Sequence, residues 1–166
     1  MYMIPVIVAG VRMEMPSNTP IVLLNEIDGT RYLPIWVGAV EATAIAYAQQ
    51  GVTPPRPMTH DLIVDLIEEL GANLTGVRIT SLTDGVFFAI LDFMTTDGQV
   101  HELSSRPSDA IALALRVGVP ITVAPDVLDA AGVEIPDEAE GEPEDQVEAF
   151  REFLEGVSPE DFEAPQ

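Results

Sequence analysis

Three short motifs occur twice in the chain, in the same order and at nearly the same spacing. The spacings are 66, 69 and 68 residues, and a common spacing of this kind is typical of an internal duplication. The pairs are Gly10-Val11-Arg12 with Gly76-Val77-Arg78, Asp28-Gly29 with Asp97-Gly98, and Glu41-Ala42-Thr43-Ala44-Ile45-Ala46 with Asp109-Ala110-Ile111-Ala112-Leu113-Ala114. We therefore predict that residues 3–51 and 70–118 form the same β-β-β-α unit.

The hydrophobic pattern within each unit predicts strands first and a helix last. Apolar runs at residues 2–14, 20–27 and 30–36 precede an alanine-rich helix at 41–48, and runs at 86–94 and 99–103 precede the second one. Asp-Gly between two apolar runs is a strong hairpin signal, and hairpins pair antiparallel. The sequence predicts an α+β fold with a mostly antiparallel sheet and packed helices. Further elements are expected at 59–70 (helix), 119–123 (strand) and 126–131 (helix).

The domain is expected to end near residue 133. Residues 134–146 are rich in proline and acidic residues, and this composition predicts an acidic linker. In residues 147–166, an apolar stripe at helical spacing predicts a C-terminal amphipathic helix followed by a tail. The stripe consists of Val147, Phe150, Leu154 and Val157.

Charge limits the classes of partner. The net charge is −21 and there is no lysine; residues 1–130 contain six arginines and fifteen acidic residues. Nucleic-acid binding depends mainly on neutralised phosphates, so any such role must depend on a few localised arginines. The absence of cysteine excludes disulfides and thiolate zinc sites. No apolar run reaches the roughly 20 residues that a membrane span needs, so we expect a cytoplasmic protein without a membrane partner.

Two Arg-Pro segments come directly before predicted helices. Arg56-Pro57 precedes the helix at 59–70, and Arg106-Pro107-Ser108-Asp109 opens the second alanine-rich helix. The helix dipole disfavours a cation at this end, so each arginine needs an anionic partner. That partner is either a carboxylate of the same chain, such as Asp61 or Asp109, or a bound phosphate, for which the guanidinium fork is well suited.

Carboxylates and one histidine accompany these arginines. Glu41 and Asp109 occupy equivalent first-turn positions, where they either complement the helix dipole or hold a divalent cation such as Mg²⁺. Asp61 is either a catalytic carboxylate or part of a solvated acidic helix face. His60 lies at the apolar edge of the same helix, either as a packed hydrogen-bonded residue or as a general acid or base.

Three ordered motifs resemble the bifunctional nuclease family, a bacterial and plant domain. They are Leu33-Pro34-Ile35-Trp36-Val37-Gly38 with Glu41-Ala42, Pro55-Arg56-Pro57-Met58-Thr59-His60-Asp61-Leu62, and Ser105-Arg106-Pro107-Ser108-Asp109-Ala110-Ile111-Ala112-Leu113-Ala114. The resemblance covers roughly residues 3–133 and implies hydrolysis of phosphodiester bonds in DNA and RNA, with nucleic acid as partner.

Two hypotheses follow for these polar residues. In a nuclease, Arg56, Arg106 and Ser108 hold the phosphodiester, His60 transfers a proton, and Glu41, Asp61 and Asp109 position water or a cation. In a non-enzymatic binding or assembly domain, the same residues form an ion-pair network that locks the two halves together. A cleft open to solvent favours the first hypothesis, and buried mutual pairs favour the second.

The apolar content of the chain also predicts self-association. Trp36, the apolar strand from Met1 to Val11 and the Phe150/Leu154 stripe exceed what a small domain needs for its core. We expect a homo-oligomer, with a dimer favoured.

Overall fold

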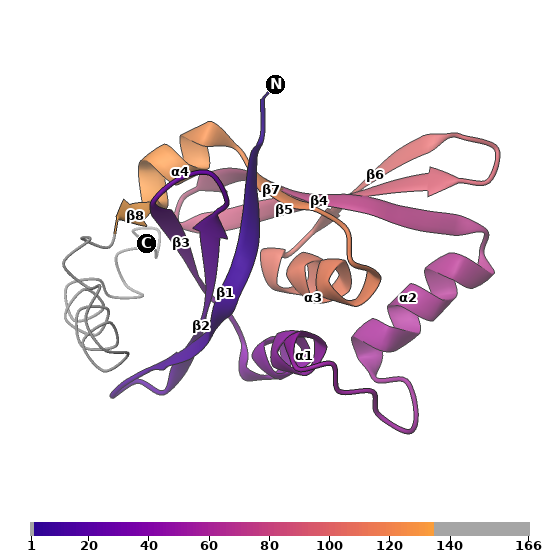
Figure 1. Ribbon diagram of the computed structural model, residues 1–166, viewed down its shortest axis with the longest axis horizontal. Helices are drawn as coiled ribbons and strands as arrows, with labels where there is room; N and C mark the ends of the chain where they lie inside the picture. Colours follow the sequence, from indigo (N-terminus) through magenta and orange to yellow (C-terminus); the bar gives the residue numbers. More distant parts are fainter. Residues whose placement is uncertain (1, 135–166) are drawn as a thin grey trace.

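The computed structural model describes residues 2–134, which form four helices and eight strands (Figure 1). In chain order these are β1 (Ile4–Glu14), β2 (Thr19–Glu26), β3 (Arg31–Trp36), α1 (Ala39–Gln49), α2 (Thr59–Glu69), β4 (Ala72–Thr83), β5 (Val86–Thr95), β6 (Val100–Ser105), α3 (Pro107–Val117), β7 (Ile121–Val123), α4 (Pro125–Ala131) and β8 (Val133–Glu134). The predicted α+β class is confirmed, and the order β-β-β-α occurs twice, with α2 between the two occurrences.

All eight strands belong to one sheet in the order β6-β5-β4-β7-β1-β2-β3-β8. Each unit contributes three consecutive strands, joined as antiparallel hairpins. The short strand β7 lies between the two units and pairs parallel with β4 and antiparallel with β1. The sheet is therefore mostly antiparallel, as predicted, and β7 is the strand that joins its two halves.

The repeated motifs mark equivalent structural features. In β1 the pairing register shifts between Val8 and Gly10, and in β4 it shifts between Leu74 and Gly76. A bulge bends a strand and increases its twist, so both units curve at the same place. Both Asp-Gly pairs lie in the predicted hairpin turns, β2–β3 and β5–β6, and Gly98 has the positive φ of +81° that glycine accommodates without strain.

Some helices and strands begin or end a few residues away from the predicted positions. The helix expected at 41–48 begins two residues earlier, because the turn before Glu41 is already helical. Glu134, expected to begin the acidic linker, pairs with Arg31 as part of β8. Residues 135–146 of the linker and the expected helix and tail at 147–166 lie outside the described residues.

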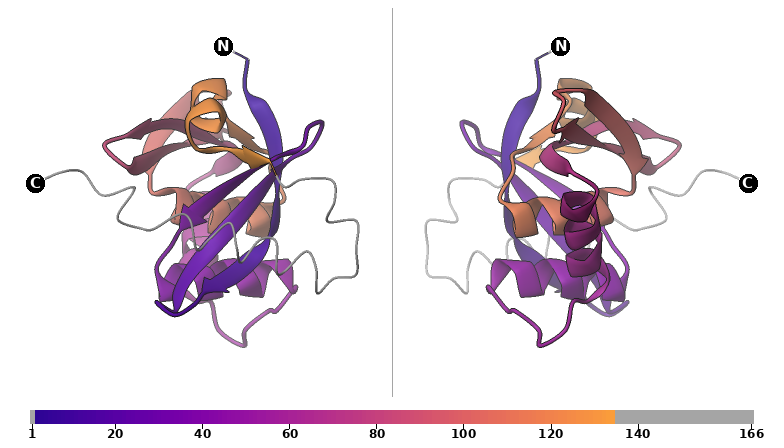
Figure 2. Two further views of the ribbon diagram at one scale, coloured as in Figure 1. Left: turned by 90° about the vertical axis from the view of Figure 1, so that its left-hand side faces the viewer. Right: turned by 90° about the vertical axis from the view of Figure 1, so that its right-hand side faces the viewer.

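Helices α1, α2 and α3 gather on one side of the sheet, whereas α4 lies on the other side, against β3 and β4 (Figures 1 and 2). Helices α1 and α3 contact each other directly. Both helices contain buried alanines, and small side chains let two packed helix axes approach closely. The buried alanines are Ala42 and Ala44 on α1 and Ala110, Ala112 and Ala114 on α3.

Overpacking this contact should destabilise the fold. Ala112 is completely buried, so Ala112→Leu should lower the free energy of unfolding by about 1–3 kcal/mol. For a domain of this size each kcal/mol lowers Tm by about 2–4 °C. The matched control is Thr43→Leu, which places the same side chain on the exposed face of α1. Equal melting temperatures for the two variants would contradict close packing around Ala112.

Candidate functional site

Glu41 and Asp109 occupy the same position in equivalent helices. Each is the third residue of its helix, and the residues just before the two helices are Gly38 and Arg106. Glu41 Oε2 occupies the space that a β-carbon at Gly38 would need, so the Glu41 side chain folds back over its own helix start. The two units are therefore equivalent in their carboxylates but not in the residue before the helix, where only the second unit has an arginine.

Arg106 bridges the two carboxylates. Its Nη2 donates to Glu41 Oε1 at 2.8 Å, and its Nε donates to Asp109 Oδ2 at 2.7 Å. The hydrogen bonds to Asp109 and then Glu41 raise the pKa of Arg106. The Arg106 side chain is 67% exposed, whereas those of Glu41 and Asp109 are 16% and 26% exposed. Nη1 of Arg106 makes no hydrogen bond to any described residue, so a fixed guanidinium presents a free edge to solvent.

His60 contacts the same cluster from α2. Its Nε2 lies 2.9 Å from Asp109 Oδ1, and its side chain is 7% exposed. Both oxygens of Asp109 are thus engaged, one by His60 and one by Arg106. Partial burial would raise the pKa of Asp109, but the hydrogen bonds from Arg106 and His60 outweigh it, and this pKa lies below its ordinary value. Glu41, His60, Arg106 and Asp109 are called the Arg106 cluster below.

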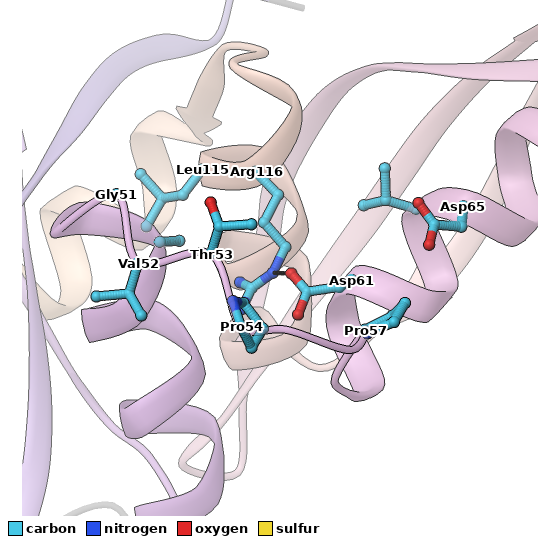
Figure 3. A pocket seen from close by; sticks show the side chains of 11 residues that line it. Gly51, Val52, Thr53, Pro54, Pro57, Asp61, Asp65, Leu115 and Arg116 are labelled. Atoms are coloured by element: carbon cyan, nitrogen blue, oxygen red, sulfur yellow. Dashed lines mark hydrogen bonds and ion pairs between the residues drawn. The ribbon is translucent and has the colours of Figure 1, made fainter.

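Asp61 belongs to a different ion pair. Its Oδ1 accepts from Arg116 Nε at 2.8 Å, and its Oδ2 accepts from the backbone N–H of Met58 at 3.0 Å, which caps α2 (Figure 3). Burial would raise the pKa of Asp61, but the hydrogen bonds from Arg116 and Met58 keep it below its ordinary value. One alternative expected for Asp61 was a place on a solvated acidic helix face. Its carboxylate instead binds Arg116 and the backbone of Met58.

The sequence motifs do not include Arg116 among the candidate site residues. Its Nη1 donates to two backbone oxygens, Ala112 O at 2.8 Å on its own helix and Ala44 O at 3.0 Å on α1. The side chain is 11% exposed. The sequence signal was a basic residue that directly follows six apolar residues, 110–115, in a predicted helix, because a charge that enters the interior needs partners.

The remaining two candidates, Arg56 and Ser108, differ in exposure. Arg56 is exposed in the connection between α1 and α2, and it makes no hydrogen bond or ion pair with any part of residues 2–134. Ser108 is buried next to Arg106, and both line an open cavity of about 390 Å³ that also contacts Phe87 and Pro107. The structure therefore brings together five of the seven predicted residues, which are Glu41, His60, Arg106, Ser108 and Asp109.

The donor set does not fit a divalent cation held by the protein alone. Residues 2–134 contain no group of three histidine, aspartate or glutamate side chains arranged to bind a metal. Glu41 and Asp109 lie close together, but they share the guanidinium of Arg106, and a cation in that position would compete with it.

The Arg106 cluster lies within a segment that matches a known family. The sequence profile of the bifunctional nuclease domain matches residues 22–136, which is more than half of the chain. The chain belongs to the bifunctional nuclease domain family. The predicted family resemblance is confirmed. Within residues 2–134, no helix is long and apolar enough to cross a membrane.

The relatives of this chain include a mycobacterial protein that it matches along nearly the whole length and plant proteins that it matches over about a third of their length. An uncharacterized protein of Mycobacterium tuberculosis is 56% identical over 162 residues, which cover 95% of this chain and 96% of the relative. Bifunctional nuclease 1 of Arabidopsis thaliana is 32% identical over 63% of this chain, and bifunctional nuclease 1 of Oryza sativa subsp. japonica is 31% identical over 62%. The matched segments span 33% and 32% of these plant proteins, so the chain corresponds to about a third of their length.

The lowered pKa of Asp109 predicts a loss of stability in acid. The folded-state pKa lies below the unfolded value of about 3.9, so the unfolded chain takes up the proton first. The contribution of Asp109 is complete above that value and is lost as pH falls through the folded-state pKa. Between pH 7 and pH 3, Asp109→Asn should start less stable and lose less stability than the wild-type protein.

Urea unfolding at each pH measures this difference. The control is Asp65→Asn, because Asp65 makes no hydrogen bond or ion pair among the described residues. Its acid dependence should match that of the wild-type protein. An Asp109→Asn variant that loses stability as steeply as the wild-type protein would contradict the assigned role of the Arg106–Asp109–His60 contacts.

Proposed function

We propose that this domain is a nuclease that hydrolyses phosphodiester bonds of DNA and RNA at the Arg106 cluster. The observation that carries the proposal is the state of Arg106: it is two-thirds exposed, fixed by two carboxylates, and free at Nη1. Arginine binds phosphate oxygens through its planar fork, and a fork already held in place loses little freedom on binding. Membership of the bifunctional nuclease family and the likeness to the plant proteins of that name support the substrate class.

Glu41 is the proposed general base. One of its oxygens is bound by Arg106, and Oε2 makes no hydrogen bond to any described residue. No buried side-chain oxygen in residues 2–134 lacks a partner, so solvent reaches Oε2. A water molecule held there loses its proton to Glu41 while its oxygen attacks phosphorus; the bond from phosphorus to the leaving oxygen breaks, and that oxygen takes a proton from solvent. Arg106 stabilises the charge that develops on the phosphoryl oxygens.

His60 and Asp109 position Arg106 in this scheme. His60 is buried and its Nε2 faces Asp109, so it acts through Asp109 rather than on substrate. The sequence suggested that His60 transfers a proton, but in this proposal Glu41 does so. Ser108 borders the adjoining cavity, and Asp61 and Arg56 take no part in the cluster.

The mutual pairing of these residues also fits a second function, that of a non-enzymatic binding or assembly domain. Glu41 on α1, His60 on α2 and Asp109 on α3 are connected through hydrogen bonds, so the cluster ties three helices together. A non-enzymatic binding or assembly domain would need this network for stability alone.

The Arg106→Ala variant separates the two functions when cleavage and Tm are measured on one preparation. For a nuclease we expect a rate loss of roughly 10²–10³-fold, the effect of removing one charge-stabilising donor. Because the two ion pairs of Arg106 are exposed, the free energy of unfolding should change by only about 0.2–1 kcal/mol for each pair.

The cleavage rate of the wild-type protein should fall steeply as the salt concentration rises. The acidic protein has few arginines, so little affinity for phosphate remains once salt screens them.

Arg12→Ala is the matched control. Arg12 is exposed on β1, remote in sequence from the cluster, and its Nη1 bonds only the carbonyl oxygen of Val11. The same charge is lost, so an equal loss of cleavage in both variants would indicate a general electrostatic effect. A large fall in Tm for Arg106→Ala, with wild-type protein that cleaves no better than a mock purification, would favour the structural network and end the nuclease proposal.

We also propose that the chain forms a homo-oligomer, with a dimer favoured. Trp36 is partly buried and donates to Glu14 Oε2 at 2.9 Å, so the support comes instead from Tyr2, Ile7 and Ile27, which are 75%, 52% and 52% exposed around β1. Ile7 and Ile27 line the same open cavity, and contiguous exposed apolar side chains mark association surfaces. Light scattering at micromolar concentration should give twice the chain mass of 17.9 kDa, and a monomer mass would contradict the proposal.

A further inference from the structure

We propose that a second site binds a small zwitterion with an apolar side chain, of the α-amino-acid type. The site is a cavity of about 420 Å³ between the end of α1, the connection to α2, and the helices α2 and α3 (Figure 3). Its volume falls within the range of about 300–1,000 Å³ that small-molecule sites have. It is called the Arg116 pocket below, and the proposal does not depend on the nuclease activity.

Arg116 supplies a fixed positive group in this pocket. Nε is bound to Asp61 and Nη1 to two backbone carbonyls, whereas Nη2 makes no hydrogen bond to any described residue. No buried side-chain nitrogen in residues 2–134 lacks a partner, so Nη2 is open to solvent although the side chain is only 11% exposed. A carboxylate of a ligand can accept from Nη2 without any rearrangement of the guanidinium.

The surrounding charges require the ligand to carry a positive group as well. Asp61 and Asp65 both line the pocket, so two carboxylates accompany the one arginine. A ligand that was only anionic would meet a local excess of negative charge. Asp61 accepts two hydrogen bonds, which leaves further lone pairs for an ammonium group. The adjacent Arg116 and Asp61, 2.8 Å apart, thus offer a donor and an acceptor to the two ends of a zwitterion.

The walls of the pocket select an apolar side chain. They are formed by Val52, Pro54, Pro57, Val64 and Leu115. Figure 3 shows Val52 and Pro54 on the connection that faces Arg116, with Leu115 beside it on α3. These groups offer an apolar ligand burial but no hydrogen bonds, which is the usual composition of a small-molecule site with a few polar groups that fix orientation.

The Arg116 pocket is separate from the Arg106 cluster. Asp109 lies in the first turn of α3 and Arg116 in the last, which corresponds to about 10 Å along the helix axis. Asp61 is the neighbour of His60 in α2, but the two side chains bind opposite ends of α3. No residue is shared between the two sets of contacts.

Three probes with one apolar body and different polar ends test the proposal on the full chain. They are L-leucine, 4-methylpentanoate, which lacks the ammonium group, and 3-methylbutylamine, which lacks the carboxylate. Titration followed by methyl NMR should give saturable shifts at Val52, Val64 and Leu115 with L-leucine, and affinities at least about tenfold weaker for the other two, a loss of about 1.4 kcal/mol. Because this readout uses the wild-type protein, it does not depend on a variant folding.

Variants then locate the binding. Ala48 lines the pocket at the end of α1, so Ala48→Leu should fill it and weaken L-leucine binding at least tenfold. Gln50→Leu adds the same side chain at an exposed position that does not line the pocket and should leave binding unchanged. The proposal is overturned by absence of saturable L-leucine binding in the millimolar range, by 4-methylpentanoate or the amine binding as tightly, or by a folded Ala48→Leu variant that binds normally.

Discussion

The contact between α1 and α3 brings the carboxylates and arginines at the two ends of these helices together. Buried alanines on both helices let their backbones approach. At one end, the approach places Glu41 and Asp109 within reach of a single arginine. At the other end, it lets Arg116 of α3 donate to the backbone oxygen of Ala44 on α1.

Arg106 contributes to this arrangement differently from the other charged residues. It is mostly exposed, and exposed ion pairs stabilise proteins by only about 0.2–1 kcal/mol. His60 and Arg116 are largely buried and paired, so their contacts hold α2 against α3. The fold can therefore keep its helices in place through His60 and Arg116 while Arg106 remains available to solvent. This division favours a binding role for Arg106 over a purely structural one.

Much of the fold could be predicted from the sequence because the duplication repeats local signals. Gly10 and Gly76 mark equivalent bulges, and the two Asp-Gly pairs mark equivalent turns, since backbone geometry restricts which residues fit there. The equivalence of Glu41 and Asp109 followed from the same repeat. The pairing of Arg106 with Asp109 was among the alternatives, because the two residues share one helix start.

Contacts between distant segments could not be predicted in the same way. The sequence grouped Asp61 with His60, yet consecutive helical residues point about 100° apart, and Asp61 reaches Arg116 instead. Arg56 matches Arg106 in its local Arg-Pro context, but it makes no ion pair with any carboxylate in residues 2–134. These outcomes depend on how α2 packs against α3, which local patterns do not encode.

The central position of β7 has a consequence for synthesis of the chain. Residues 121–123 pair with residues 4–6 of β1 and 77–79 of β4, so the sheet is closed by a segment made after both β-β-β-α units. Until then β1 and β4 each present an unpaired edge, and unpaired edges readily pair with strands of other chains. A nascent or truncated chain that ends before residue 121 is consequently exposed to strand exchange between copies, a hazard that three residues remove once they are in place.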